Sequence, residues 1–172
     1  MPKNIVHWLF AIFAGTVIAA GALSSAAHAR ELVAFAGFRS GTIVIKTNER
    51  QLYLVLGDGS AIRYPVGVGR AGQQWAGVSH IDGKYVAPDW IAPPDLRRDR
   101  NAPAHVVRGG SPQNPMGAAA LTLTGGEYAI HGTNQPRSIG GFVSAGCIRM
   151  HNADVVDLYA RVGVGTPVVV MR

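Results

Sequence analysis

Short apolar runs, most of them ended by Gly, Asn or Asp, follow one another along much of the chain. The first three are Thr42–Thr47, Gln51–Leu56 and Ala61–Val66, which are rich in β-branched and aromatic side chains. Turn-forming residues at 48–50 and 57–59 separate these runs. Runs of this kind between turns predict strands, so we expect a three-stranded β-meander in this part of the chain.

Shorter apolar runs occupy the rest of the chain. Val78–Val86 predicts a weaker pair of strands that turns at Asp82-Gly83. Leu121–Leu123 and Tyr128–Ile130 predict two further short strands, and Thr166–Met171 predicts a closing strand. The repeated strand pattern indicates a mainly β protein.

Two segments depart from this strand pattern. Residues 87–117 contain six prolines and predict a long ordered loop, a type of segment that is often functional in a compact domain. The one convincing helix begins near Asn152, which is a favourable N-cap residue, and ends at Gly163. Its predicted apolar face comprises Val155, Val156, Leu158, Tyr159 and Val162.

Composition narrows the class of protein. The 172 residues are 48% hydrophobic and 15% charged, which is typical of a folded domain. The single cysteine excludes an intramolecular disulfide and any zinc site that needs two or more cysteines. The formal charge of +6 is spread along the chain, with residues 97–100 as its densest cluster. This charge suits an anionic surface such as a cell wall and is too diffuse to indicate nucleic-acid binding.

The N-terminal segment predicts export. Lys3 precedes the apolar run Ile5–Leu23, and the small-residue site Ala27-His28-Ala29 follows it. This order is typical of a Sec-type signal peptide, so we expect residues 1–29 to be removed and the protein to act in the periplasm. The alternative is a retained membrane anchor, because the run is about long enough to span a bilayer. After residue 29 we expect a short N-terminal lead at 30–40 and one domain at 41–172.

The stretch from His131 to Met150 carries the candidate chemistry. It contains Cys147, and His131 ends a predicted strand in the same stretch. A thiolate is the nucleophilic form of cysteine, and an imidazole can either take the thiol proton or hold the thiolate as an ion pair. Gly146 lets the backbone approach a substrate carbonyl, and Arg149 offers a planar cation for a carboxylate. From the residues alone, a buried structural cysteine and histidine remain an alternative.

Three motifs together resemble a known family. HGTN at 131–134, SIG at 138–140 and SAGCIRM at 144–150 are similar to the catalytic domain of the L,D-transpeptidases, the YkuD family. TNERQLYLVLGDGSAIRYPVGVGR, from Thr47, resembles the first hairpin and following strand of that family. NPMG, from Asn114, resembles its N-P-x-G loop, so the resemblance covers about Gly41 to Met171.

The resemblance implies both a fold and a reaction. It implies an L,D-transpeptidase-type β-sandwich with one short helix after the catalytic cysteine motif. It also implies an enzyme acting on the stem peptides of peptidoglycan. The cysteine is acylated by a tetrapeptide stem at its third residue, usually diaminopimelate, and D-Ala is released. The acyl group then passes to an amine, either of another stem or of a wall-attached lipoprotein. No cofactor and no metal are implied.

The resemblance also implies roles for individual residues. Cys147 matches the nucleophile, His131 matches the general base and acid, and the Gly132 carbonyl matches the group that orients the imidazole. The oxyanion- and substrate-binding positions correspond to Gly146, Arg149, Ser144 and Asn134, with the Cys147 amide as second oxyanion donor.

This chain departs from the family pattern at one position. Many members carry histidine directly before the Gly-Cys pair, where this chain has Ala145, which makes His131 the only plausible base within the motif. A zinc site made by His105, His131 and His151 lacks any metal-ligand spacing such as H-E-x-x-H. Trp75 and Trp90 either stack on substrate or anchor loops.

Two alternatives to a transpeptidase stay open. One is a wall hydrolase of the same chemistry, a carboxypeptidase or endopeptidase that passes the thioester to water or cuts an existing linkage. The other is a wall-binding module with a silent cysteine. We expect peptidoglycan stem peptides as partners, with no nucleic acid and no membrane after signal cleavage. The sequence leaves the acceptor amine and the oligomeric state undetermined.

Overall fold

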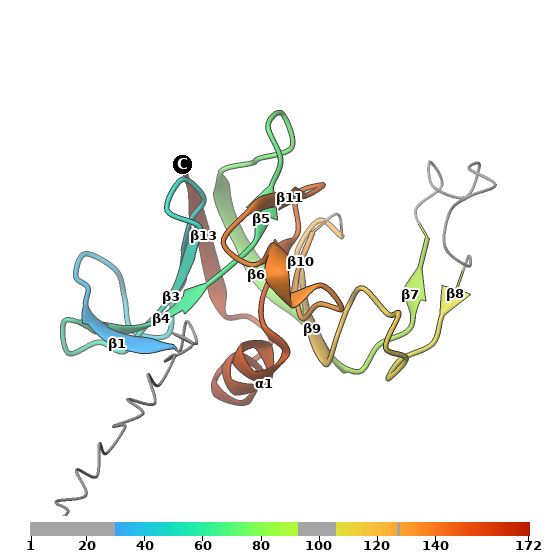
Figure 1. The fold of residues 1–172 in the computed structure, drawn as a ribbon. Coiled ribbons are helices and arrows are strands. Elements are labelled where there is room, and N and C mark those ends of the chain that lie inside the picture. The colour runs from blue at the N-terminus through green and yellow to red at the C-terminus, as the bar shows by residue number, and fades with distance from the viewer. Residues whose placement is uncertain (1–29, 93–105, 127) are drawn as a thin grey trace, which may run out of the picture.

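The computed structural model describes residues 30–92, 106–126 and 128–172 (Figure 1). The predicted signal peptide at 1–29, the basic cluster at 97–100 and His105 lie outside the described residues. The elements, in chain order, are β1 (Glu31–Ala34), β2 (Ile43–Lys46), β3 (Gln51–Val55), β4 (Ser60–Pro65), β5 (Val68–Gly69), β6 (Gly77–Val86), β7 (Trp90–Ile91), β8 (Val106–Val107), β9 (Ala119–Leu123), β10 (Ala129–His131), the 3-10 helix η2 (Pro136–Ser138), β11 (Phe142–Ser144), β12 (Ile148–Arg149), α1 (Asn152–Arg161) and β13 (Pro167–Met171).

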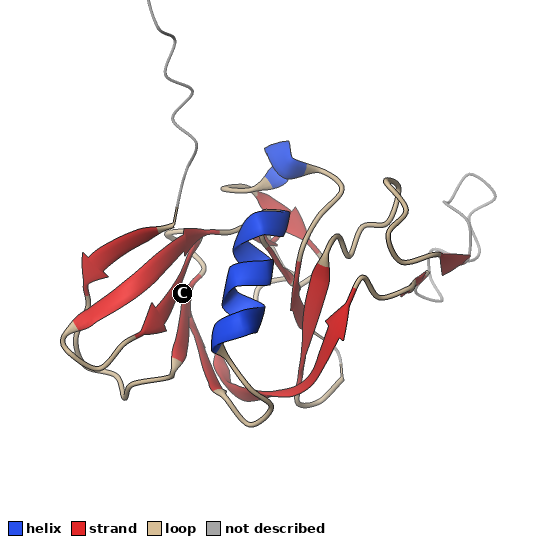
Figure 2. Ribbon diagram, turned by 90° about the horizontal axis from the view of Figure 1, so that it is seen from below, coloured by secondary structure: helices blue, strands red, loops and turns tan. Residues whose placement is uncertain are grey.

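One sheet in the described part of the chain runs in the order β1-β4-β3-β2-β13-β6-β9-β10-β12. Its long strand β6 belongs to both halves, since residues 77–80 pair with β13 and residues 81–86 pair with β9. The register shifts between Ile81 and Gly83, which is a β-bulge, and a bulge bends a strand. The two halves therefore pack over a common apolar core, and the predicted β-sandwich with one helix after the cysteine motif is confirmed (Figures 1 and 2).

The same bulge corrects one prediction. Val78–Val86 does not turn at Asp82-Gly83 but continues as part of the single strand β6. Asp82 is the extra residue of the bulge, and its carboxylate accepts a hydrogen bond from the Thr122 hydroxyl on β9. A side chain at Gly83 would collide with that same hydroxyl and with the Tyr85 ring. Asp and Gly favour bulges as well as turns, so their presence did not distinguish the two.

The predicted meander is confirmed as the antiparallel strands β2, β3 and β4. Its outer face is covered by the N-terminal lead, which forms an edge strand, β1, that the sequence did not predict. Phe35 stacks on Tyr53 with ring centroids 4.4 Å apart and packs against the buried Val44 and Val55. Both faces of this layer are therefore covered by apolar side chains.

Helix α1 packs across β9 and β10, beside the end of the cysteine motif (Figure 2). Val155, Leu158 and Val162 are buried as predicted, but Val156 is 51% exposed because it lies about 100° around the helix from Val155. Asn152 is the first helical residue and not the N-cap, which is His151. The predicted closing strand is confirmed as β13, which lies between β2 and β6. Within the described residues, no helix is long and apolar enough to cross a membrane.

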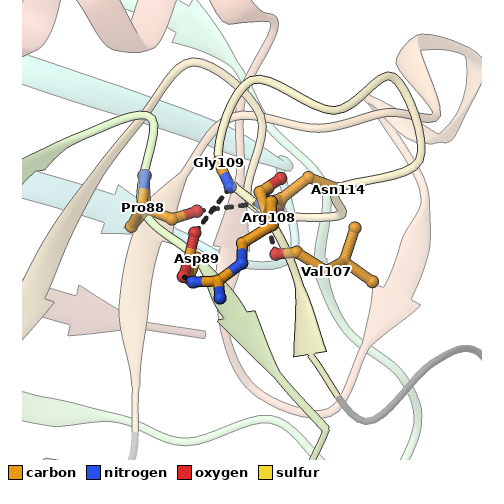
Figure 3. Close-up of polar contacts among 6 residues, drawn as sticks. All are labelled: Pro88, Asp89, Val107, Arg108, Gly109 and Asn114. Atoms are coloured by element: carbon orange, nitrogen blue, oxygen red, sulfur yellow. Dashed lines mark hydrogen bonds and ion pairs between the residues drawn. The ribbon is translucent and has the colours of Figure 1, made fainter.

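The described ends of the predicted loop at 87–117 are ordered. Strands β7 and β8 pair antiparallel and project from the sandwich (Figure 1). The buried Asn114 side chain holds their base, because its Nδ2 donates to the carbonyls of Pro88, Val107 and Arg108 at 2.8–3.2 Å (Figure 3). Its Oδ1 also accepts from the Met116 amide at 2.8 Å. The asparagine of the NPMG motif is therefore a local anchor.

Candidate active site

Strands β10 and β12 bring the two halves of the candidate motif together. They pair in parallel, with Ile130 opposite Ile148 and His131 opposite Arg149. The two isoleucines are buried in the core, and successive side chains in a strand point to opposite faces, so His131 and Arg149 share the other face. Cys147 directly precedes β12, and its thiol lies near enough to Arg149 for the guanidinium charge to lower its pKa. The structure thus gathers the three predicted side chains at one sheet edge.

The His131 imidazole is buried, with 5% of the residue exposed, and held by backbone carbonyls. Its Nδ1 lies 2.7 Å from the Gly132 carbonyl oxygen. Because a carbonyl oxygen can only accept, Nδ1 carries the proton and Nε2 is the nitrogen free to accept one. Burial lowers the pKa of His131 to about 4, opposed by hydrogen bonds to the carbonyls of Gly132 and Pro115 and assisted by the Arg149 charge. The imidazole is therefore neutral at neutral pH.

Cys147 is a partly buried free thiol. Burial raises its pKa, while a backbone hydrogen bond from Ala129 and the Arg149 charge act in the opposite direction. A raised thiol pKa beside a histidine of lowered pKa disfavours a preformed thiolate–imidazolium pair in the free protein. Of the two predicted modes, these pKa directions favour the one in which the imidazole takes the thiol proton.

The turn from Ser144 to Cys147 is closed by the serine side chain. Ser144 Oγ donates to the Cys147 carbonyl at 2.6 Å and accepts from the Gly146 amide at 3.1 Å. Gly146 has φ +127°, and a Cβ there would lie 2.2 Å from Cε1 of Tyr128, so only glycine fits. The Gly146 N–H is thus engaged within the turn, and Ser144 is a buried structural member of it.

An aromatic pair braces this turn from outside the motif. The Trp75 indole N–H donates to the Gly146 carbonyl at 3.1 Å, and its ring stacks on Tyr128 at 4.9 Å with an interplanar angle of 6°. Of the two sequence interpretations, Trp75 is a loop anchor, while Trp90 lies in β7. The sequence did not predict this role for Tyr128, because the local pattern around Tyr128 indicated only a strand.

Arg149 is a half-buried cation that forms no ion pair with any residue in the described part of the chain. The salt bridges there join other residues, and Arg149 Nε is buried with no hydrogen-bond partner. Burial lowers the pKa of Arg149, and the nearby Arg70 charge adds to this effect. Its backbone is fixed by two hydrogen bonds to Gly67, each 2.8 Å. A guanidinium in this state can bind a carboxylate from a ligand.

Asn134 lies farther along the same loop, in a different setting. It is exposed, and its Nδ2 donates to the Gln113 carbonyl at 2.9 Å. It lines a cavity of about 400 Å³. The other residues of that cavity are Ala87, Gly110, Ser111, Pro112, Asn114, Gly117, Ala118, Thr133 and Asn152. Asn134 thus borders a neighbouring cavity whose lining does not include Cys147, His131 or Arg149.

Asn152 contributes to the site in a way that its expected N-cap role did not indicate. Its Oδ1 accepts from the amides of Ala118 and Thr133 at 3.1 and 3.0 Å, and its Nδ2 donates to the Thr133 carbonyl at 3.1 Å. A Cβ on Gly117 or on Gly132 would lie 2.2 Å from that Oδ1. The position of the Asn152 side chain therefore explains why the NPMG and HGTN motifs each have glycine there and no larger residue.

The zinc alternative has no geometric support in the part of the chain that the structure describes. No group of three or more His, Cys, Asp or Glu side chains there is placed to hold a metal ion. His105, one of the three candidate ligands, lies outside that part.

Comparison with known proteins identifies the family of this chain. The family model of the L,D-transpeptidase catalytic domain, YkuD, matches residues 40–170. The chain is 40% identical over 136 residues to "Probable L,D-transpeptidase ErfK/SrfK" of Escherichia coli (strain K12), covering 73% of this chain and 42% of that protein. It is 37% identical over 134 residues to "Probable L,D-transpeptidase YbiS" of the same organism, covering 73% and 43%. The chain therefore belongs to the L,D-transpeptidase family, and the matched region spans about two fifths of these relatives' length.

Solved structures share the fold. L,D-transpeptidase 3 from Mycobacterium tuberculosis gives a TM-score of 0.61 at 16% identity, covering 76% of this chain and 60% of that chain. The catalytic domain of an L,D-transpeptidase from E. faecium gives 0.58 at 16% identity, covering 79% and 100%. At such identities the likeness concerns the arrangement of strands and helix.

Proposed function

We propose that this chain is a peptidoglycan L,D-transpeptidase, an acyltransferase with Cys147 as nucleophile. The observation that carries the proposal is the His131 imidazole. Its Nδ1 proton is held by the Gly132 carbonyl at 2.7 Å. Arg149, the strand partner of His131, forms no ion pair with the residues that the structure describes. With the proton on Nδ1, Nε2 can accept one, and Cys147 directly precedes β12, the strand that pairs with the strand of His131. The names of the relatives support the same activity.

In the first half-reaction, His131 Nε2 takes the proton of the Cys147 thiol as the sulfur attacks the carbonyl carbon of the stem's third residue. The carbonyl oxygen becomes an oxyanion in the tetrahedral intermediate. The Cys147 amide is the donor that we assign to this oxyanion, since the Gly146 amide is engaged by Ser144. The intermediate collapses, the C–N bond breaks, and His131 returns its proton to the amine of the departing D-Ala. A thioester on Cys147 remains.

In the second half-reaction, neutral His131 removes a proton from the incoming amine as its nitrogen attacks the thioester carbonyl. The C–S bond breaks, an amide forms, and Cys147 regains its proton through the imidazole. The acceptor is a stem-peptide amine or the amine of a wall-attached lipoprotein. If water takes the place of the amine, the same residues give a wall hydrolase, which is the second candidate.

Arg149 supplies substrate recognition in this proposal. A half-buried guanidinium without an acidic partner in the described structure is suited to a carboxylate of the stem peptide. The net positive charge of the chain suits the anionic wall. The signal-like segment at 1–29 supports export to the periplasm. N-terminal sequencing of the exported protein tests this step, and residues 1–29 retained in the membrane fraction would favour the anchor.

The deciding experiment is incubation of the purified protein with tetrapeptide muropeptides, with products read by mass. We expect release of D-Ala and a cross-linked or amine-capped product. His131→Ala should slow acyl-enzyme formation by roughly a hundredfold, which is typical of losing a general base. A tripeptide product, lighter than the substrate by one alanine residue and carrying no amine adduct, would identify the hydrolase. No turnover and no acyl-enzyme in the folded wild type would favour the silent wall-binding module.

A further inference from the structure

The peptide bond between Gly132 and Thr133 makes a hydrogen bond at each end. Its carbonyl oxygen, on Gly132, faces His131 Nδ1 at 2.7 Å. Its N–H, on Thr133, donates to Asn152 Oδ1 at 3.0 Å. A trans peptide is planar, with its C=O and N–H pointing in opposite directions. Fixing the N–H end therefore fixes the direction of the carbonyl that holds the imidazole.

Two further hydrogen bonds, to groups outside this peptide, hold the Asn152 side chain in place. Its Nδ2 donates to the Thr133 carbonyl at 3.1 Å, and its Oδ1 also accepts from the Ala118 amide at 3.1 Å. The carboxamide lies so close to Gly132 that a Cβ there would be 2.2 Å from Oδ1. Thr133 is 3% exposed, which leaves its backbone little access to water as an alternative partner.

We propose that Asn152 is a positioning residue for His131, acting through the Gly132–Thr133 peptide. The inference rests on the proposed function only in taking His131 as the base. The chain of hydrogen bonds runs from imidazole Nδ1–H to the Gly132 carbonyl, and from the Thr133 N–H to Asn152 Oδ1. Hydrogen bonds in such a chain polarise one another, so acceptance at Asn152 strengthens the Gly132 carbonyl as an acceptor.

The consequence concerns the tautomer of His131. With the carbonyl aligned, the proton stays on Nδ1 and the lone pair stays on Nε2, where the thiol proton must go. Without Asn152 the peptide can tilt, and the Nε2–H tautomer becomes populated. That tautomer cannot accept a proton at Nε2. Asn152 thus does, through a peptide bond, what a third side chain does for the histidine of a catalytic triad.

Three variants test this proposal. Asn152→Ala removes the acceptor, and Asn152→Asp keeps an acceptor for the Thr133 N–H while losing the donation to the Thr133 carbonyl. Val155→Ala is the matched control, since it also loosens α1 but removes no hydrogen bond to the peptide. The rate of Cys147 alkylation by iodoacetamide at pH 7, on folded protein, reports proton removal independently of any transpeptidase activity. Two-bond ¹⁵N–¹H spectra report the His131 tautomer.

We expect Asn152→Ala to slow alkylation by about tenfold and to show an Nε2–H signal for His131. Asn152→Asp should stay within about threefold of the wild type and keep the Nδ1–H pattern, because Oδ acceptance is retained. If Asn152→Ala does not fold, an Nε2–H signal in Asn152→Asp overturns the proposal and an Nδ1–H signal supports it. An Nδ1–H pattern in folded Asn152→Ala, or an equal slowing in Val155→Ala, would show a merely structural role. Absence of muropeptide turnover in wild type would reject the proposed function and leave these measurements unaffected.

Discussion

The two layers of the sandwich are stabilised in different ways. The β2–β3–β4 layer buries apolar side chains on both faces, and antiparallel neighbours pair along its whole length. The β10–β12 edge is a short parallel pair that carries a buried histidine and a half-buried arginine. Apolar burial is non-directional, whereas buried polar groups need specific partners. The stability of the β2–β3–β4 layer therefore depends on the shape and area of its apolar contacts. The geometry of the β10–β12 edge depends on specific hydrogen bonds from segments that are distant in the sequence.

Cys147→Ala is expected to give the largest difference between an effect on activity and an effect on stability. This variant should abolish acylation and leave the free energy of unfolding within about 0.5 kcal/mol of the wild type, since a small partly buried side chain is replaced by a smaller one. Carbapenem trapping followed by mass spectrometry measures the effect, with one adduct per chain expected in the wild type. Full muropeptide turnover in Cys147→Ala would remove Cys147 as the nucleophile.

The reverse result is expected from Leu52→Ala in the β2–β3–β4 layer. Leu52 is fully buried, and truncating a buried leucine costs about 2–5 kcal/mol of unfolding free energy. Chemical denaturation measures this loss. The acylation rate per folded molecule should be unchanged at a temperature well below the transition. A rate that falls in proportion to stability would mean that the two regions are not independent.

The buried imidazole should make the site edge sensitive to acid. The His131 pKa falls from its ordinary 6.5 to about 4 on folding, so between these values the unfolded chain binds a proton that the folded chain does not. Stability should therefore fall as the pH falls from 6.5 to 4, by up to about 3 kcal/mol from this group, and change no further below 4. Denaturation of wild type and His131→Gln at pH 7.5 and pH 4.5 isolates this contribution, because other titrating groups cancel in the difference. Equal pH dependence in both proteins would contradict a neutral buried imidazole.

A smaller effect is expected from Arg149→Lys. Lysine keeps the charge but loses the planar fork, so acylation by a tetrapeptide stem should slow by about tenfold with the fold retained. Steady-state and single-turnover rates on muropeptides check this. Wild-type rates in the lysine variant would instead indicate an ordinary surface cation, of the kind worth about 0–1 kcal/mol.

The smallest expected effect is on the stability of an Arg149→Met variant. Arg149→Met removes a half-buried charge that has no acidic partner in the described structure, so it should raise the free energy of unfolding by about 0.5–1 kcal/mol while impairing activity. Thermal and chemical denaturation of the variant beside wild type give the sign. A clear loss of stability would mean that Arg149 supports the fold and is not held there at a cost.

The local pattern of apolar and polar residues was sufficient to predict much of the secondary structure of this molecule. The alternation from Thr42 to Val66 predicted the meander, because side-chain period and turn residues act over a few positions. The motif from His131 to Met150 predicted the candidate site residues, and the strand register then placed His131 and Arg149 on one face, with Cys147 directly before β12. The predicted turn at Asp82-Gly83 failed because pairing with β9 and β13 overrode a local preference.

What the sequence by itself determined was therefore the longer strands, the helix after the cysteine motif, and the candidate site residues. The tertiary structure decided how those residues are held. Tyr128 and Trp75 confine the Gly146 turn, and Asn152, expected only as a helix cap, grips the peptide behind His131. These contacts join segments from 18 to 71 positions apart. A hydrogen bond or a steric limit between such segments exists only once the chain has folded, so no local pattern of polar and apolar residues encodes it.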